Sequence, residues 1–258
     1  QGGAVGIDLG VVRFATLSDG TFHAPLNSFK RHEARLRKAQ QAMSRKTKFS
    51  NNWKKAKARV QRIHSRIGNA RRDFLHKATT TISQNHAMVC LEDLQVRNMS
   101  RSAAGTTGQP GRNVRAKSGL NKAILDQGWA EFRRQLDYKL AWNGGHLIAV
   151  PAQNTSRTCP CCGHVSADNR QTQARFQCVE CGFEENADVV GAINILSRGM
   201  QRLRDEGQDT ADASAGRETV ARIACEVSGA VMPPAAGTRR SDLCRLDAGM
   251  SAVGIPGL

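Results

Sequence analysis

Four cysteines in the second half of the chain constrain its fold more than any other feature. Cys159 and Cys162 form one C-x2-C pair, Cys178 and Cys181 form a second, and fifteen residues separate the pairs. Each pair predicts a knuckle whose two sulfur atoms turn toward one ion, and four thiolates at about 2.3 Å make a closed, structural zinc site. Disulfides are one alternative, and iron, which also accepts four thiolates, is another. We therefore expect a zinc ribbon over residues 155–185.

Positive charge is in large excess. The 258 residues include 38 Lys and Arg against 22 Asp and Glu, a formal net charge of +16 at pH 7. Such an excess predicts a polyanionic partner, most often a nucleic acid. An anionic membrane surface is the alternative, but we expect no basic helix with an exposed aromatic face that could enter lipid.

Hydrophobic residues make up 40% of the chain, which is enough for a core and excludes a wholly disordered protein. No apolar run reaches the roughly 18 residues of a membrane span, and the first residues lack the basic start of a signal peptide. We expect a soluble, cytoplasmic, nucleoid-associated protein. Because the chain begins with Gln1 and enters a strand-like run almost at once, we expect it to be the C-terminal part of a longer protein.

The segment 29–86 is expected to be a basic helical insertion. It contains seventeen Lys and Arg, and only Glu33 and Asp73 oppose them. Apolar residues spaced by three and four from Val60 to Ile82 predict that one face packs while the basic face stays free, with a bend at 46–52. We expect the free face to contact phosphates, although a solvated charged surface is the alternative. The cations expected to make these contacts are Lys54, Lys55, Lys57, Arg59, Arg62 and Arg66.

The order of the expected elements indicates an α/β protein. Three short strands come first, and strands and helices then alternate. The expected strands are 4–9, 11–17, 21–24, 87–91 and 146–150, and the expected helices are 30–77, 120–140 and 187–198. This order predicts a mixed sheet covered by helices, which is the order of the ribonuclease H-like fold.

Three acidic residues are candidates for a catalytic site. Asp8 lies inside the apolar first strand, Glu92 follows the strand at 87–91, and Asp188 opens the last helix. Burying a carboxylate costs several kcal/mol unless it is paired or binds a metal. If the sheet brings the three together, their oxygens suit Mg²⁺ or Mn²⁺, which would activate water and stabilise the leaving 3′ oxygen of a phosphodiester. The alternatives are a helix-terminal acid for Asp188 and a solvated loop acid for Glu92.

Neighbouring residues are not expected to share these roles. Cys161 lies inside the first cysteine pair but breaks its spacing, so we do not expect it to bind the ion. Asp93 should point away from Glu92 because successive side chains of a strand alternate between its faces. Cys90 lies in an apolar run and is expected to be a packed strand residue.

Taken together and in this order, these motifs resemble the TnpB (OrfB) family of insertion-sequence transposons over residues 4–200. The matching stretches are Gly6–Val11, Cys90–Leu94, Ser118–Lys139, Thr155–Gly163 and Asn186–Leu196. At position 190, two residues after Asp188, the family usually has an asparagine, whereas this chain has Val190.

The resemblance implies a RuvC-like nuclease with an inserted, target-binding zinc ribbon, and proteins of this family are RNA-guided DNA endonucleases associated with transposable elements. Under it, Asp8, Glu92 and Asp188 are the catalytic acids that hold Mg²⁺, and the partners are a DNA target and a guide RNA. The chain is then a Mg-dependent endodeoxyribonuclease. The alternative is a non-catalytic, nucleic-acid-binding remnant of such a nuclease, because the family's N-terminal domains are not in this sequence.

This interpretation divides the chain into four parts. We expect a RuvC-like core over residues 1–154, the ribbon over 155–185, the last helix of the core over 186–200, and a mostly disordered tail over 201–258.

Overall fold

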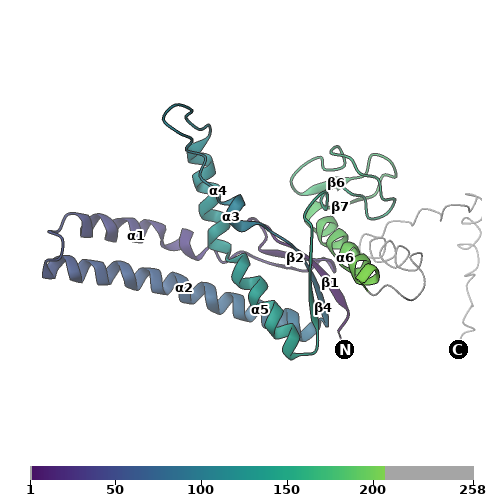
Figure 1. Cartoon of the computed structure of the whole chain (residues 1–258), viewed down its shortest axis with the longest axis horizontal. Helices are drawn as coiled ribbons and strands as arrows, with labels where there is room; N and C mark the ends of the chain where they lie inside the picture. Colours follow the sequence, from purple (N-terminus) through teal and green to yellow (C-terminus); the bar gives the residue numbers. More distant parts are fainter. Residues whose placement is uncertain (1, 207–258) are drawn as a thin grey trace, which may run out of the picture.

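The computed structural model describes residues 2–206, and a five-stranded mixed sheet lies at their centre (Figure 1). The strands are β1 (Ala4–Asp8), β2 (Ala15–Leu17), β3 (Phe22–His23), β4 (Met88–Glu92) and β5 (His146–Val150). They lie in the order β3-β2-β1-β4-β5; β1 is antiparallel to β2 and parallel to β4, and β4 is parallel to β5. The expectation of a mixed α/β sheet is confirmed. A separate two-stranded sheet pairs β6 (Arg175–Gln177) with β7 (Glu184–Asn186).

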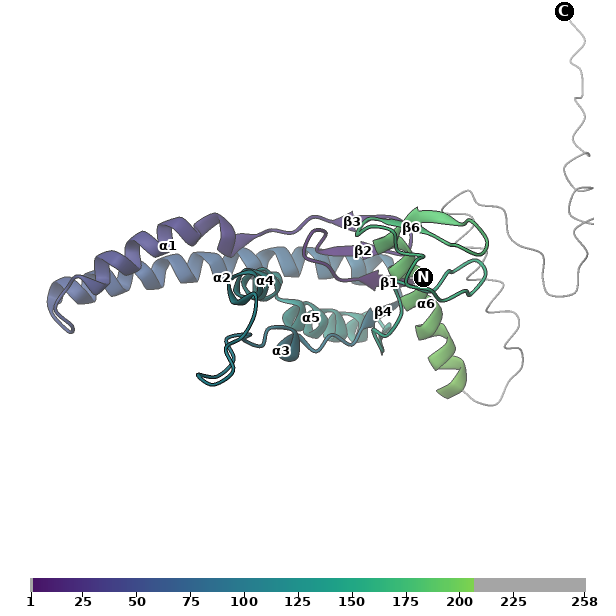
Figure 2. The same ribbon diagram turned by 90° about the horizontal axis from the view of Figure 1, so that it is seen from above.

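Helices cover both faces of the large sheet. The helices are α1 (Ser28–Ser44), α2 (Asn51–Asn85), α3 (Val96–Met99), α4 (Val114–Gln127), α5 (Trp129–Trp142) and α6 (Ala187–Glu206). Side chains that alternate along β4 separate the two faces, since Val89 and Leu91 pack with α2 and α5 whereas Cys90 packs with α6. Figures 1 and 2 show α1 and α2 as an antiparallel hairpin that projects away from the sheet and from the small β6–β7 sheet.

Helix α6 lies unusually close to the strands beneath it. A β-carbon at Gly6 would lie 2.0 Å from the carbonyl oxygen of Ala192, and one at Gly199 would lie 2.2 Å from Cys90 Sγ. A side chain at either position would therefore force the helix and the sheet apart. Gly199 is thus a packing residue inside α6, and the helix continues to Glu206 instead of ending near residue 200 as expected. Residues 207–258, the remainder of the expected tail, lie outside the described residues.

The helix expected over 120–140 is divided in two. Gly128 has a φ of +75°, a left-handed conformation that favours glycine, and it ends α4 and begins α5. The expected strand 11–17 is also shorter: β2 spans only Ala15–Leu17, of which Thr16 and Leu17 pair with β1.

The basic hairpin has the predicted form. Helix α1 ends at Ser44 and α2 begins at Asn51, which confirms the predicted bend. The side chain of Ser50 caps α2 by accepting a hydrogen bond from the backbone N–H of Trp53 at 3.2 Å. The apolar residues buried between the two helices are Leu36, Ala39, Val60, Ile63 and Ile67.

A buried carboxylate anchors the N-terminus of α1. Asp126, at the end of α4, accepts hydrogen bonds from the backbone N–H groups of Phe29 (2.8 Å) and Lys30 (3.3 Å). It also forms an ion pair with Arg71 of α2, with Nη2 and Oδ1 2.7 Å apart. One carboxylate thus joins three helices and satisfies N–H groups that a helix leaves without partners.

Replacing Asp126 by Ala should lower the free energy of unfolding by about 2–3 kcal/mol, because two N–H groups and a guanidinium lose their acceptor. Chemical denaturation measures this change. Asp73→Ala is the matched control, since it removes the exposed pair that Asp73 forms with Lys77 one turn away on α2 and should cost less than about 0.5 kcal/mol. Equal losses in the two variants would show that Asp126 is no anchor.

Candidate functional site and metal centre

The parallel pairing of β1 and β4 brings two of the predicted acids together. Ile7 pairs with Leu91, so Asp8 and Glu92, the next residue of each strand, lie at the same end of the sheet. Asp188 reaches this end from the first turn of α6, where its backbone N–H donates to the Asn186 side chain at 3.0 Å. We call Asp8, Glu92 and Asp188 the acid edge.

Gly191 explains how α6 can lie so near Asp8. It follows Asp188 by three residues, and a β-carbon there would lie 3.3 Å from the carboxyl carbon of Asp8. The face of α6 that carries Asp188 therefore lies directly against the Asp8 carboxyl group.

The electrostatics of the acid edge reflect this crowding. Burial raises the pKa of Asp8 from 3.8 to about 7, and the charges of Glu92 and Asp188 raise it in the same direction. Burial also raises the pKa of Glu92, against the lowering effect of a hydrogen bond from Thr155 and the charge of Arg198. Carboxylates that repel one another in a partly buried place would be stabilised by a cation.

Two polar residues that the sequence analysis left without a role support the acid edge. Thr155 Oγ1 donates a hydrogen bond to Glu92 Oε1 at 2.6 Å. Asn194 Nδ2 in turn donates to the carbonyl oxygens of Thr155 (2.7 Å) and Thr158 (2.8 Å). Thr155 and Asn194 are both buried. The sequence feature that could have revealed this support is Asn194, a polar residue within an otherwise apolar stretch of α6.

The four predicted cysteines converge. The ligand atoms of Cys159, Cys162, Cys178 and Cys181 all lie within 4.8 Å of one another. The Sγ atoms of Cys159 and Cys181 are 3.7 Å apart, and those of Cys162 and Cys178 are 3.6 Å apart. Tetrahedral geometry with 2.3 Å metal–sulfur bonds requires about 3.8 Å, whereas a disulfide requires about 2 Å. Cys161 is not in the group, as expected.

Both knuckles are followed by a glycine in the left-handed conformation. Gly163 and Gly182 follow the second cysteine of each pair with φ values of +78° and +74°. The buried Asn169 joins the knuckles: its side chain donates to the carbonyl oxygens of Arg157 (3.0 Å) and His164 (3.2 Å) and accepts from the backbone N–H of Val179 (3.0 Å). Within residues 2–206, these cysteines are the one group of three or more potential metal ligands whose ligand atoms lie this close together. The carboxylates of Asp8, Glu92 and Asp188 are therefore spaced more widely than the four sulfur atoms.

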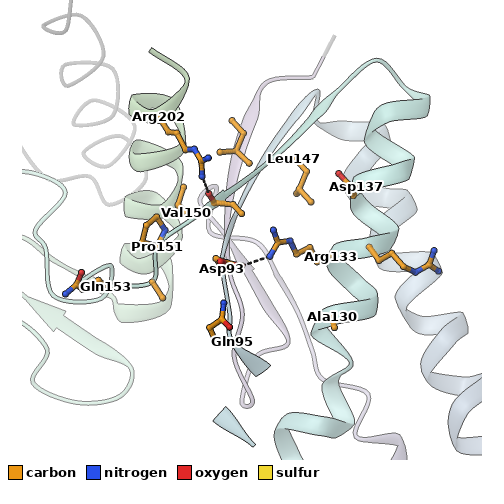
Figure 3. A pocket seen from close by; sticks show the side chains of 14 residues that line it. Asp93, Gln95, Ala130, Arg133, Asp137, Leu147, Val150, Pro151, Gln153 and Arg202 are labelled. Carbon is orange, nitrogen blue, oxygen red and sulfur yellow. Dashed lines mark hydrogen bonds and ion pairs between the residues drawn. The ribbon is translucent and has the colours of Figure 1, made fainter. Parts of the chain in front are cut away.

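A cavity of about 850 Å³ lies beside β5, between α5 and α6 (Figure 3). The acid edge does not line it, but Asp93 does, where its Oδ1 lies 2.5 Å from Nη1 of Arg133. The prediction that Asp93 points away from the acid edge is thereby confirmed.

The predicted phosphate-binding cations lie elsewhere, exposed on α2 of the projecting hairpin; they are Lys54, Lys55, Lys57, Arg59, Arg62 and Arg66.

Residues 1–103 match the OrfB_IS605 family, described as "Probable transposase", and residues 129–195 match the family described as "Cas12f1-like, TNB domain". Over 195 residues the chain is 59% identical to a protein of Escherichia coli K12 named "Putative RNA-guided DNA endonuclease InsQ". The chain belongs to the OrfB (TnpB) family. The resemblance inferred from its motifs is confirmed.

The relatives that this OrfB chain matches are longer than the chain itself. A "Putative RNA-guided DNA endonuclease" of Streptomyces pristinaespiralis is 37% identical over 198 residues. Both alignments cover 76% of this OrfB chain but only 48% of InsQ and 45% of the Streptomyces protein, so the chain spans about half the length of these relatives.

The fold also has a solved counterpart. The cryo-EM structure of a Cas12f1-sgRNA-target DNA complex aligns with a TM-score of 0.50 and 19% identity, covering 74% of the OrfB chain and 49% of the other. At this identity the likeness concerns the fold alone. None of the helices between residues 2 and 206 is both long and apolar enough to span a bilayer.

In metal-free buffer, Asp8→Asn should stabilise the OrfB chain at pH 7.5 by about 2–4 kcal/mol. The unfolded carboxyl titrates near pH 3.8 and the folded one near 7. Between these values the folded state binds more protons, so the stability of the wild type falls as pH rises. Asparagine carries no charge at any pH, so the difference in unfolding free energy between the variant and the wild type should vanish near pH 4. Denaturation at several pH values measures it, and a variant no more stable at pH 7.5 would contradict the crowding of the acid edge.

Proposed function

We propose that this chain is the DNA-cleaving part of an RNA-guided endonuclease of the OrfB family. The observation that carries the proposal is the meeting of Asp8, Glu92 and Asp188, from three distant segments, at one end of the sheet. The strand order β3-β2-β1-β4-β5, with β2 antiparallel, favours a ribonuclease H-like, RuvC-type core. The names of the two relatives, both "Putative RNA-guided DNA endonuclease", support the same activity.

The three carboxylates would hold two Mg²⁺ or Mn²⁺ ions, which when bound activate the attacking water and stabilise the leaving 3′ oxygen of a phosphodiester. Asp8, Glu92 and Asp188 would supply the charged oxygen ligands that these ions prefer, and the repulsion that Asp8 feels from the other two carboxylates is what a bound cation would relieve. The positive charges of Arg170 and Arg198 partly offset the raised pKa values of Asp8 and Glu92, respectively, and so favour the ionised carboxylates. Thr155 would hold the Glu92 carboxylate in one orientation.

The four cysteines would hold one structural Zn²⁺, for which their sulfur spacing is suitable. Residues 155–185 would then be a zinc ribbon inserted into a core formed by residues 1–154 and 186–200. The target DNA and a guide RNA would lie along the basic hairpin, where the six exposed cations of α2 contact phosphates.

The experiment that tests the proposal compares two adjacent acids. With Mg²⁺ or Mn²⁺ present, the wild-type chain should cut labelled single-stranded DNA, and Glu92→Gln should lower the rate by more than about 100-fold, because even outer-shell changes typically cost 10–100-fold. Asp93→Asn is the matched control and should retain activity, since Asp93 faces Arg133. DNA affinity should be unchanged in both variants. Cleavage by Glu92→Gln would remove this residue from the site, and binding without cleavage by the wild type would favour a non-catalytic role.

Cys178→Ser should abolish zinc binding, because three thiolates no longer close the tetrahedral shell. Metal analysis of the purified chain should find one zinc per wild-type molecule and close to none in the variant. Cys161→Ser, which changes the same residue type beside the cluster, should keep its zinc. Loss of zinc from both variants, or from neither, would contradict the ligand assignment.

A further inference from the structure

The turn of the basic hairpin carries two aromatic side chains that the core does not use. Phe49 is 67% exposed, and its ring lies 5.5 Å from that of the half-buried Trp53 in an edge-to-face arrangement. Neither residue belongs to the apolar cluster that joins α1 and α2. We call Phe49 and Trp53 the aromatic tip. We expected no exposed aromatic face on a basic helix, and the exposed ring of Phe49, in the turn between the two basic helices, departs from that expectation.

Positive charge surrounds the aromatic tip. The Nζ atoms of Lys48 and Lys57 lie 5.2 Å and 5.3 Å from the ring centres of Phe49 and Trp53. Residues 34–72 contain fourteen Lys and Arg and no Asp or Glu. The rings therefore lie in a strongly positive field without a compensating acid.

The backbone at the turn is costly for an aromatic residue. Phe49 has a φ of +68°, a left-handed conformation that glycine or asparagine adopts more readily. Contact with another molecule would account for a bulky ring that is held exposed in this conformation.

The hairpin also carries the tip far from the acid edge. Helix α2 has 35 residues and is about 52 Å long at 1.5 Å per residue. In Figures 1 and 2 the turn is the part of the hairpin most distant from the sheet. The tip can thus reach nucleic acid well beyond the strand that enters the acid edge.

We propose that the aromatic tip stacks on an exposed base face of nucleic acid, either an unpaired base or the terminal pair of a duplex, while Lys48, Lys57 and their neighbours bind the flanking phosphates. Every base offers a π face, so this contact holds position without reading sequence. The inference rests on the proposed function in that the hairpin binds nucleic acid. A membrane is the poorer partner, because the apolar stripe of the hairpin is already buried between its helices and only two rings remain.

The test measures the affinity of the full 258-residue chain for a labelled single strand, a blunt duplex and a covalently closed circular duplex. Phe49→Asn preserves the turn, since asparagine tolerates its φ, and should keep the melting temperature while weakening binding by about five- to hundredfold. Trp142→Leu is the matched control, because Trp142 is 78% exposed and packs edge-to-face on Tyr138, but lies at the end of α5. Its affinities should be unchanged.

The three substrates separate the sources of the base. A loss confined to the single strand assigns an unpaired base, and a loss on the blunt duplex but not on the circle assigns a terminal pair. An equal loss on the circle, which exposes no base, would overturn stacking, as would full affinity of Phe49→Asn. Binding to anionic vesicles that disappears in Phe49→Asn would overturn it in favour of a membrane. If the wild type binds nucleic acid and Phe49→Asn binds it equally well, stacking is overturned and the proposed function stands. If the wild type binds no nucleic acid, both the stacking and the proposed function are overturned.

Discussion

The close contact of α6 with β1 and β4 is the constraint on which the functional arrangement depends. Gly6 on the strand and Gly199 on the helix remove the side chains that would separate the two backbones. Because the helix lies directly on the sheet, its first turn reaches the ends of β1 and β4, and Asp188 joins Asp8 and Glu92. Where a β-carbon would meet a carbonyl oxygen at 2.0 Å, no rotamer change relieves the clash. The acid edge thus depends on residues that carry no charge.

The same contact determines where the cysteine cluster lies. The chain leaves the sheet after β5, forms both knuckles and the β6–β7 pair, and returns at the start of α6. The segment that carries the cysteines is therefore attached at both ends to elements next to the acid edge. The basic hairpin is inserted between β3 and β4, so it joins the sheet through the start of α1 and the end of α2. It extends away from the sheet on the side opposite to the β6–β7 pair (Figure 2).

Features that depend on local geometry could be predicted from the sequence, and those that depend on distant partners could not. The C-x2-C spacing predicts its own knuckle, and the apolar period of α2 predicts its buried face. By contrast, Asp126 anchors a helix that begins almost a hundred residues earlier, so nothing near it in the sequence indicates that role. Gly199 has the sequence context of a helix end, yet its packing partner is Cys90, more than a hundred residues away. Thr155 lay within a recognised motif, but its contact with Glu92 required the three-dimensional structure.

The hydrogen bonds of Thr155 connect the two halves of the functional region in series. Asn194 holds the carbonyl oxygens of Thr155 and Thr158, and Thr158 immediately precedes the first cysteine knuckle. The single proton of the Thr155 hydroxyl has two acceptors within reach, Glu92 Oε1 at 2.6 Å and the carbonyl oxygen of Ala152 at 3.2 Å. Because the hydrogen bond from Thr155 lowers the pKa of Glu92, any displacement of the first knuckle that moved Thr155 would also change how readily Glu92 ionises.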